Sequence, residues 1–296
     1  MSEPGLTQRS SPHRPAHWPT ARTRVVGTIG DPIEHSLSPL LHQAAFDALG
    51  LDWVSVGFLV RRGAANEALS GMRALGIAGL SVTMPHKADV ATTVDELTPL
   101  AHRLGAVNCV INRDGHLVGD STDGAGLLDA LRRGAGFDPV GRRCCVIGAG
   151  GAARAAVVAL ADAGATDVVV LNRTASRAEA AAALAGAAGS VGGPEAIESA
   201  ELVVHATPSG MAGSGDGAAA GPLQYSRFFH EGQVVMDLVY VPADTPILRA
   251  ASDRGARTVG GIGMLVHQAA LAIENWTGRS APVEQMWSAA VGELAG

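Results

Sequence analysis

A glycine-rich turn near the middle of the chain has the residue types and spacing of a nucleotide-binding site. Gly148–Ala153 reads Gly-Ala-Gly-Gly-Ala-Ala, with short apolar residues before it and an alanine-rich run after it. This spacing fits the dinucleotide fingerprint G-x-G-x-x-A, in which a buried strand turns sharply into a helix whose first N–H groups face a phosphate. The pattern alone is weak evidence, because glycine-rich turns also serve as plain connections.

The residues after the next apolar run indicate which dinucleotide the turn would bind. Asp167–Leu171 is followed by Asn172-Arg173-Thr174, about 20 positions past the first glycines, where an acidic residue would select NAD. Asn172 can hydrogen-bond a ribose, whereas Arg173 and Arg177 offer planar cationic groups suited to a 2′-phosphate. Alternatively, both arginines are solvated charges at the start of an exposed helix. Their position relative to the turn favours NADP.

A second group of polar residues follows apolar runs in the first half of the chain. Ligands collect at the carboxyl ends of strands in α/β sheets, so these positions are the first candidates for a substrate site. They are Ser36, Ser38, Ser81, Thr83, Lys87, Asn108 and Asp123. Hydroxyls and an amide in one pocket suit a small polyhydroxylated or carboxylated molecule, and the lysine and aspartate could handle its proton.

Each of these residues also has a purely structural interpretation. Ser38 could be the N-cap of a helix whose first residue is Pro39, and Asp123 could cap the following helix. Asn108 could satisfy the backbone of a turn, and Lys87 could be a solvated surface charge. The ten histidines show no metal-binding spacing such as H-E-x-x-H, so we expect no metal.

The elements that must position these residues alternate between strands and helices. We expect strands at 24–30, 53–60, 77–83, 167–171, 201–205, 233–238 and 257–259, a further strand before the glycine turn, and helices at 39–49, 64–75, 126–134, 152–164, 175–187, 245–254, 264–277 and 283–294. Short connections between them indicate an α/β fold with a parallel or mostly parallel sheet.

The length of 296 residues and the 47% hydrophobic content suit two domains of about 150 residues each. We expect a disordered extension over residues 1–20, which are rich in proline and serine. Residues 21–125 would form the first domain, completed by the helices in 262–296, and residues 126–261 the nucleotide-binding domain. The segment Gly213–Gly221 is predicted to be a flexible loop and could close over the site.

Composition argues against several classes of protein. The net charge of −6 is spread along the chain and gives no basic stripe, so we expect no nucleic-acid partner. No apolar stretch reaches the length of about 20 residues needed to span a membrane, and the N-terminus lacks an apolar signal core. Cys144 and Cys145 would point to opposite faces of one strand and Cys109 lies in an apolar run, so all three are expected to be buried thiols of a cytoplasmic protein.

Taken together, these motifs resemble those of the shikimate dehydrogenase family. The matching segments, in order, are 36–39, 82–87, 105–108, 121–124, 148–154 and 172–174. Several motifs in one order are more specific than any one alone, and the resemblance covers the chain from about Val25 to its end. It implies reversible reduction of 3-dehydroshikimate to shikimate with NADPH, in a cleft between a substrate-binding domain and a Rossmann-type domain.

The resemblance also implies roles for single residues. Lys87 and Asp123 would be the catalytic pair that flanks the oxygen at the reacting carbon. The substrate-binding residues would be Ser36, Ser38, Ser81, Thr83, Asn108, Tyr240 and Gln268. The cofactor-binding residues would be Gly148, Ala149, Gly150, Gly151, Ala152, Asn172, Arg173, Thr174, Arg177, Thr207 and Gly261, with Arg154 as a further phosphate contact. The protein would act as a monomer or homodimer.

Three positions depart from the family pattern: Ser81, Ser121 and His205 stand where asparagine is common. These departures leave quinate or an amino-substituted analogue as alternative substrates, the former with NAD. A catalytically inactive relative that senses a dinucleotide is the alternative outside the enzymes, although the presence of both Lys87 and Asp123 speaks against it.

Overall fold

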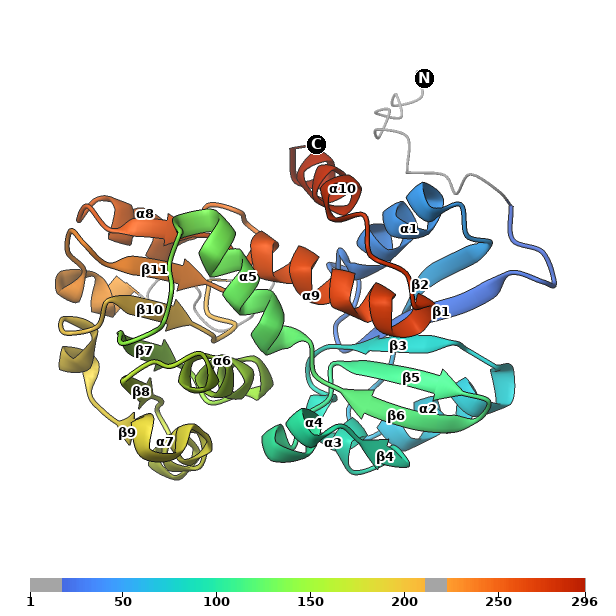
Figure 1. Ribbon diagram of the computed structural model, residues 1–296, viewed down its shortest axis with the longest axis horizontal. Helices are drawn as coiled ribbons and strands as arrows, with labels where there is room; N and C mark the ends of the chain where they lie inside the picture. Colours follow the sequence, from blue (N-terminus) through green and yellow to red (C-terminus); the bar gives the residue numbers. More distant parts are fainter. Residues whose placement is uncertain (1–17, 211–222, 296) are drawn as a thin grey trace, which may run out of the picture.

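The computed structural model describes residues 18–210 and 223–295. Most of the extension 1–20 and all of the loop 213–221 lie outside the described residues. The described chain forms two six-stranded sheets with helices packed on them, and the helices α5 (Asp123–Ala135) and α9 (Gly261–Thr277) run between the two (Figure 1). We refer to the parts of the molecule around the first and second sheets as the first and second lobes.

The first sheet is built by the N-terminal half of the chain and is mixed. Its strands, in spatial order, are β2 (Trp53–Leu59), β1 (Arg24–Gly30), β3 (Gly79–Val82), β5 (Cys109–Arg113), β6 (His116–Asp120) and β4 (Glu96–Leu97). β5 runs antiparallel to β3 and to β6. Asp114 and Gly115, with φ of 53° and 93°, form the tight turn between β5 and β6, a connection that only antiparallel neighbours allow. β4, β5 and β6 were not among the expected strands.

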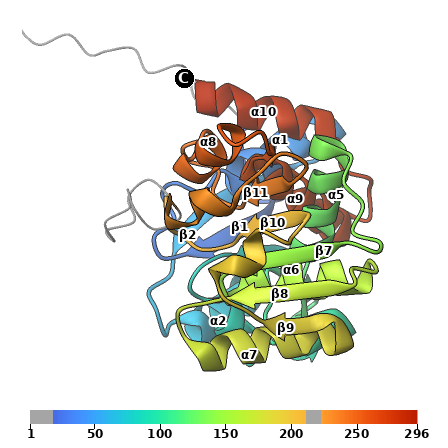
Figure 2. The same ribbon diagram turned by 90° about the vertical axis from the view of Figure 1, so that its left-hand side faces the viewer.

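The second sheet is entirely parallel. Its strands, in spatial order, are β12 (Arg257–Val259), β11 (Val234–Asp237), β10 (Leu202–His205), β7 (Arg143–Ile147), β8 (Asp167–Leu171) and β9 (Gly189–Val191). Figure 2 shows β9, β8, β7, β10 and β11 stacked in this order. The order is that of the doubly wound Rossmann fold, in which ligands bind outside the strand ends where the direction of winding reverses, here between β7 and β10. The expected, mostly parallel α/β architecture is confirmed.

All the expected helices are present, with shifts at their ends, and the short helices α3 and α4 are additional. Besides α5 and α9 they are α1 (Ser38–Leu49), α2 (Ala65–Leu75), α3 (Lys87–Ala91), α4 (Pro99–Leu104), α6 (Gly151–Asp162), α7 (Ala175–Ala182), α8 (Pro246–Ser252) and α10 (Val283–Ala295), and the 3₁₀ segments are Ala183–Ala188, Pro194–Ile197 and Leu223–Phe228. The helix expected at 175–187 ends at 182, because the chain kinks at Gly186 (φ 58°) and enters β9. Across the described residues, every helix is too short or too polar to cross a bilayer.

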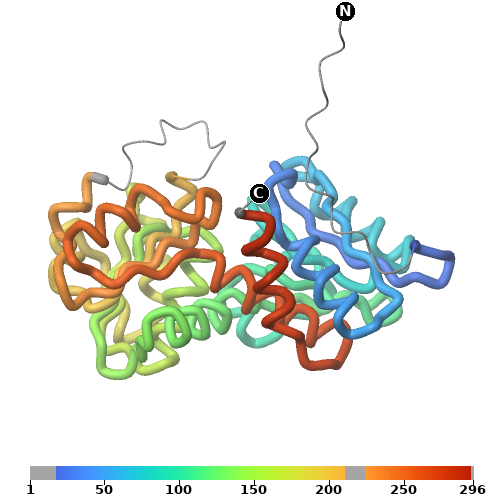
Figure 3. Tube along the Cα trace, turned by 90° about the horizontal axis from the view of Figure 1, so that it is seen from above, coloured from blue at the N-terminus to red at the C-terminus, as the bar shows by residue number. Residues whose placement is uncertain are grey.

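The final two helices pack back on the first lobe. Figure 3 shows α10 beside the N-terminal part of the chain, and Phe46 of α1, Trp276 of α9 and Met286 of α10 share one buried apolar cluster. The Trp276 Nε1–H donates a hydrogen bond to the Val110 carbonyl oxygen at 3.1 Å. The first lobe is therefore built from two separate stretches of the chain.

The three cysteines are buried and unpaired, as predicted. Cys144 lies in the apolar cluster on one face of the second sheet and Cys145 in the cluster on the other face. Burial raises the pKa of each of the three thiols to about 12. They are therefore protonated and unreactive near neutral pH, which agrees with a structural role.

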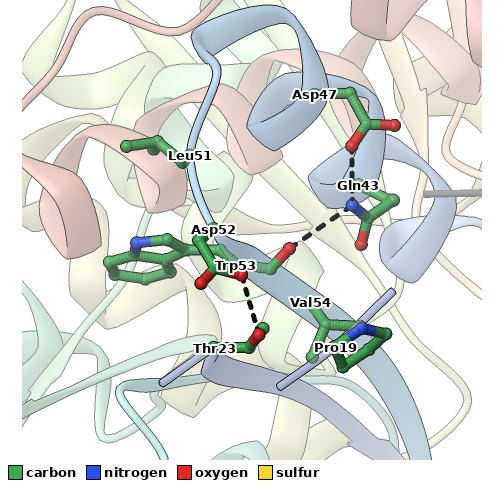
Figure 4. Close-up of a pocket in the computed structure, with 8 residues that line it drawn as sticks. All are labelled: Pro19, Thr23, Gln43, Asp47, Leu51, Asp52, Trp53 and Val54. Carbon is green, nitrogen blue, oxygen red and sulfur yellow. Dashed lines mark hydrogen bonds between the residues drawn. The ribbon is translucent and has the colours of Figure 1, made fainter. Parts of the chain in front are cut away.

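A small pocket lies between α1 and the start of β2 (Figure 4). The Thr23 hydroxyl donates to Asp52 at 2.7 Å, and the Gln43 amide donates to Asp47 at 2.9 Å and to the Trp53 carbonyl at 3.4 Å. Its volume of about 10 Å³ holds about one water molecule. None of the predicted site residues lines it, so these bonds join helix to strand and the pocket is structural.

His42 of α1 is expected to make the stability of the protein depend on pH. Its ring is fully buried, with Nδ1 3.1 Å from Ser55 Oγ and the ring edge-on to Trp276 at 4.9 Å between centroids. Burial lowers the pKa of His42 from 6.5 to about 3, so between these values the unfolded chain binds a proton that the folded protein does not. The free energy of unfolding should therefore fall as the pH drops below about 6.5, by up to about 1.4 kcal/mol per pH unit from this group.

Urea unfolding at several pH values between 4 and 7 tests this expectation. His42→Asn keeps a polar group near Ser55 and removes the titration, so its unfolding free energy should depend less steeply on pH than that of the wild type. His102→Gln, at an exposed histidine, is the control and should keep the wild-type slope. Equal slopes for wild type and His42→Asn would contradict the assignment.

Candidate active site

The centre of the candidate site is an ion pair between Lys87 and Asp123. Lys87 Nζ lies 2.5 Å from Asp123 Oδ2, and the two side chains are 18% and 6% exposed. Lys87 is the first residue of α3 and Asp123 the first residue of α5, so two separate helices bring the charges together. The interpretation of Lys87 as a solvated surface charge is therefore wrong. Desolvating such a pair costs much of its Coulombic gain, so stability alone is a poor reason for it.

Asn108 holds the carboxylate of Asp123 in place and is itself bonded to Thr122 and Gln268. Asn108 Nδ2 donates to Asp123 Oδ1 at 2.8 Å and also lies 2.9 Å from Thr122 Oγ1 and 3.1 Å from Gln268 Oε1. The Thr122 hydroxyl in turn donates to the Gln268 carbonyl oxygen at 3.0 Å. Oδ1 of Asp123 is thus occupied by an amide, and Oδ2 is directed to Lys87.

Asn108 also satisfies backbone, as its structural interpretation predicted. Its Oδ1 accepts the Thr122 N–H at 2.8 Å. Gln268 reaches the cluster because α9 crosses α5 closely at Gly126, where an added Cβ would lie 2.7 Å from the Gln268 nitrogen. The C-terminal helix therefore completes the site from outside the first half of the chain.

Two residues interpreted as helix caps do not have that role. α1 begins at Ser38 and its N-cap position falls on Leu37, whereas α5 begins at residue 123 and not at 126, with Thr122 at its N-cap. Leu37 and Thr122 have helical backbone angles and neither helix has a side-chain cap, because a capping side chain needs an extended residue before the first turn. Asp123 instead lies inside the first turn, where the helix dipole favours a negative charge.

A second cluster of hydroxyls precedes α1. Ser36 Oγ accepts the Ser38 N–H at 3.4 Å, and Ser38 is buried. Tyr240 follows β11 in the second lobe and lies close to Ser36 and to the Leu37 backbone, and burial raises the pKa of its phenol. The Tyr240 hydroxyl is therefore protonated near neutral pH.

Ser81 and Thr83 lie at the end of β3 and directly after it. Ser81 is buried, as is Ser121, which lies two positions before Asp123 in sequence. The Thr83 N–H donates to the Ile29 carbonyl at 3.0 Å, which holds the segment to β1. No side-chain hydrogen bond joins Ser81 or Thr83 to the Asn108–Gln268 network in the described part of the chain.

The glycine-rich turn joins β7 to α6, as predicted. Gly148 has φ of 124°, and an added Cβ there would lie 2.9 Å from the Ala206 carbonyl oxygen, so this position requires glycine. Gly150 is the N-cap of α6, and the place where its Cβ would lie is open. The N–H groups of the first helical turn have no intrahelical acceptor. The turn therefore fits the phosphates of a dinucleotide.

The turn lies directly beside the ion pair. A Cβ on Gly151 would lie 3.2 Å from Lys87 Cδ. The two lobes are held together here by a small apolar cluster and by a salt bridge from Arg103 on α4 to Asp162 on α6, at 2.8 Å. The glycine-rich turn and the ion pair thus lie next to each other.

The residues expected to contact the adenosine half and the phosphates lie near the turn. Asn172 donates a hydrogen bond to the Thr174 carbonyl at 3.1 Å. Arg173 and Arg177 are exposed and form no salt bridge within the described ranges. Arg154 extends toward Gly105 of the first lobe, and its buried Nε has no hydrogen-bond partner there. These cations are available to an anionic ligand.

Thr207 and Gly261, the other expected cofactor residues, lie at the carboxyl edge of the second sheet. Thr207 Cγ2 would be 3.2 Å from a Cβ on Gly148, and Gly261 packs against the Leu238 and Val239 carbonyls. Within residues 18–210 and 223–295 no group of three or more His, Cys, Asp and Glu side chains forms a metal site.

Some features of the site have further signals in the sequence. Lys87 is the only lysine among the 22 basic residues of the chain, which separates it from ordinary surface cations. Thr122 stands inside the 121–124 motif but was not singled out as a site residue. His205 and Asp237 form a buried pair, with Nδ1 2.8 Å from Oδ1, because each ends a strand of the second sheet.

Comparison with known proteins relates the whole chain to one group of enzymes. Three family models match it: the shikimate dehydrogenase substrate binding domain over residues 28–110, shikimate / quinate 5-dehydrogenase over 135–212, and the shikimate 5'-dehydrogenase C-terminal domain over 261–291. A relative from Moorella thermoacetica, named shikimate dehydrogenase (NADP(+)), is 45% identical over 276 residues, which cover 90% of this chain and 92% of the relative.

Two solved structures resemble the chain over nearly its full length. One is a shikimate dehydrogenase in complex with NADP+, with a TM-score of 0.86 and 36% identity, covering 93% of this chain and 97% of the other. Another is the enzyme from Thermus thermophilus with NADP(H) and shikimate, with a TM-score of 0.84 and 35% identity, covering 91% of this chain and 99% of the other.

Proposed function

The chain belongs to the shikimate dehydrogenase family, and from this premise we propose that Lys87 and Asp123 handle the proton while shikimate and 3-dehydroshikimate are interconverted. The protein is an NADP-dependent oxidoreductase. Quinate, an amino-substituted analogue and a purely dinucleotide-sensing role are not favoured. The observation that carries the proton-handling proposal is the partly buried Lys87–Asp123 pair, which lies directly against Gly151 of the dinucleotide turn.

The bound nicotinamide supplies or accepts the hydride, and the protein supplies the proton. In the direction of reduction, negative charge grows on the carbonyl oxygen, and Lys87 Nζ donates a proton to it. The resulting amine regains a proton from solvent. Asp123 Oδ2 keeps Nζ in position and stabilises the ammonium. In the direction of oxidation, the Lys87 amine accepts the proton of the hydroxyl that becomes the carbonyl.

The remaining residues of the site position the substrate. Asn108 and Gln268 present amides that suit ring hydroxyls, and Asn108 also orients the Asp123 carboxylate. Ser36, Ser38 and Tyr240 form a cluster of hydroxyls that suits the substrate carboxylate. We assign Ser81 and Thr83, at the end of β3, to the same pocket.

The turn Gly148–Ala152 would bind the pyrophosphate, and Arg173 with Arg177 the 2′-phosphate of NADP. Asn172, Thr174, Thr207 and Gly261 would complete the cofactor site. We further propose domain boundaries at 125/126 and 261/262, within or beside the two helices that link the lobes, and action as a monomer or homodimer. The three buried, unpaired thiols support a cytoplasmic location.

Steady-state oxidation of shikimate, followed by the absorbance of the reduced nicotinamide, tests the function. We expect turnover with NADP⁺, and a kcat/KM with NAD⁺ that is lower by about 10- to 100-fold, because a charge-assisted contact with the 2′-phosphate is worth about 1.5–3 kcal/mol. Quinate and aminoshikimate should be poorer substrates. Absence of shikimate turnover with either cofactor would refute the proposed function.

The variant Arg173→Glu separates the cofactor assignment from the reaction. It should lower kcat/KM with NADP⁺ and leave the value with NAD⁺ nearly unchanged. Arg254→Glu is the matched control, at an exposed arginine of the same lobe. If Arg173→Glu kept the wild-type preference for NADP⁺ over NAD⁺, the role of Arg173 would be wrong, but the proposed reaction would stand.

A further inference from the structure

Three polar side chains form a hydrogen-bonded chain at the carboxyl edge of the second sheet. His205 ends β10 and Asp237 ends β11, and the two residues are partners in the strand register. His205 Nδ1 lies 2.8 Å from Asp237 Oδ1, and His205 Nε2 lies 2.5 Å from Thr207 Oγ1. A carboxylate is thereby connected through an imidazole to a hydroxyl. We call these three residues the Asp–His–Thr chain.

Burying the polar groups of the Asp–His–Thr chain costs free energy, so a purely structural role does not explain their presence. The side chains of His205 and Asp237 are 2% and 1% exposed. Two residues earlier on the same strands, Val203 and Val235 lie in a buried apolar cluster, so the polar pair caps an apolar layer. Asp237 Oδ2 is buried and has no hydrogen-bond partner in the described ranges. An apolar pair at these positions would avoid the cost of desolvating His205 and Asp237. Stability alone therefore does not explain the pair, which points to a function.

The direction of each hydrogen bond follows from the acceptors. Asp237 Oδ1 also accepts the Val239 N–H at 3.1 Å, so this oxygen is an acceptor, and we assign to His205 the tautomer with its hydrogen on Nδ1. The Nε2 atom then has a free lone pair, and the Thr207 hydroxyl donates to it. Thr207 Oγ1 also accepts the Ser209 N–H at 3.4 Å. Toward a ligand, Thr207 therefore presents only a lone pair.

The position of Thr207 relates it to one end of the cofactor. A dinucleotide straddles the point where the winding of the sheet reverses, with its pyrophosphate at the glycine turn. Because the adenosine half extends toward Asn172 at the end of β8, the nicotinamide half extends over β10 and β11. Thr207 lies on this side, with its methyl group against Gly148 of the turn.

We propose that His205 is a positioning residue that, held by Asp237, turns Thr207 into an acceptor for a hydrogen-bond donor at the nicotinamide end of NADP, such as the carboxamide N–H. Thr207 alone could rotate its hydroxyl and present a hydrogen to the carboxamide N–H. The Asp–His–Thr chain removes that freedom and so orders the site before the cofactor binds. Because this role rests on the proposed NADP-dependent function, its test must measure cofactor binding in the wild type first.

A double-mutant cycle read by calorimetric titration with NADP⁺ tests the proposal. His205→Asn keeps an N–H for Asp237 and loses the contact with Thr207, and Thr207→Val loses the hydroxyl. Each single change should weaken NADP⁺ binding, by about 5- to 10-fold, which is the net effect expected of one hydrogen bond. In the Thr207→Val background, His205→Asn should have less than a roughly twofold further effect.

Matched controls are His230→Asn, at an exposed histidine of the same lobe, and Thr166→Val, at a threonine before β8; neither should alter NADP⁺ binding. If the losses of NADP⁺ affinity in His205→Asn and Thr207→Val multiply in the double variant, the two residues act independently and the proposal is wrong. If the wild type binds NADP⁺ and Thr207→Val binds it equally tightly, this inference is wrong and the proposed function stands. A wild type that does not bind NADP⁺ would overturn both.

A measurement on the wild-type protein does not depend on the variants folding. Nitrogen-15 chemical shifts of the histidine side chains, recorded at pH 8, should show His205 with its hydrogen on Nδ1, and a change at Nε2 on addition of NADP⁺. A hydrogen on Nε2 would reverse the direction of the Thr207 bond and overturn the proposal.

Discussion

Replacing Lys87 with alanine is expected to lower kcat for shikimate oxidation by about 10³-fold and to change the KM for shikimate by less than about threefold. General acid–base catalysis by a positioned side chain contributes about 10²- to 10⁴-fold, and Lys87 Nζ is the cation held at 2.5 Å from Asp123 beside the dinucleotide turn. Loss of this group removes the proton donor and leaves the other substrate contacts in place. Steady-state kinetics with saturating NADP⁺ measure the effect.

Two further measurements separate proton transfer from charge at this position. Lys87→Arg retains the positive charge, but a guanidinium does not release its proton, so its kcat should also fall by at least about 10²-fold. Lys87 is the only lysine of the chain, so reductive methylation changes this side chain and, besides it, only the N-terminal amine. The dimethylated amine still titrates and should keep more activity than the arginine variant. A kcat near the wild-type value in Lys87→Ala would contradict the assignment.

Replacing Asp123 with asparagine is expected to lower kcat by about 10²-fold and to destabilise the protein by about 3 kcal/mol. The asparagine of this variant would still present an oxygen to Asn108 Nδ2, but the charge that holds Lys87 Nζ would be lost, and a largely buried ammonium would be left without its partner. Kinetics and urea unfolding measure the two effects separately. The loss in kcat should persist at temperatures well below the unfolding transition.

Asp129→Asn is the matched control for this change. Asp129 lies on the same helix, α5, and pairs with Arg132 at 2.8 Å, but both side chains are exposed. Exposed pairs contribute about 0–1 kcal/mol, so this variant should keep the wild-type kcat and nearly the wild-type stability. If Asp129→Asn and Asp123→Asn had the same kcat, the role of Asp123 would be refuted.

The order of strands and helices could be read from the sequence wherever the signal was local. Gly50 ends α1 in the left-handed conformation and Gly148 turns β7 into α6, and both positions were expected because few other residues adopt such backbone angles. Helix starts were less predictable. Ser38 and Asp123 have the residue types of caps, but the turn of the chain before each of them placed them inside the helix.

The candidate site could be predicted as a set of residues but not as an arrangement. The place of Asn108 after an apolar run predicts it as a site residue, yet the three contacts of its amide come from α5, from α9 and from the residue before α5. Gln268 is predicted only through the family resemblance. His205 was noticed only as a departure from the family pattern. Its pairing with Asp237 depends on the register of β10 and β11, which the sequence alone does not show.

The sequence by itself determined the α/β class, the dinucleotide turn, the preference for NADP and the polar residues that follow the strands. These features depend on neighbours in the chain, through hydrophobic periodicity and the backbone limits of glycine and proline. Only the tertiary structure decided which polar groups meet: Lys87 with Asp123 across 36 positions, His205 with Asp237 across 32, and Asn108 with Gln268 across 160. Such contacts arise from the register of strands and the crossing of helices, which the packing of the whole chain sets.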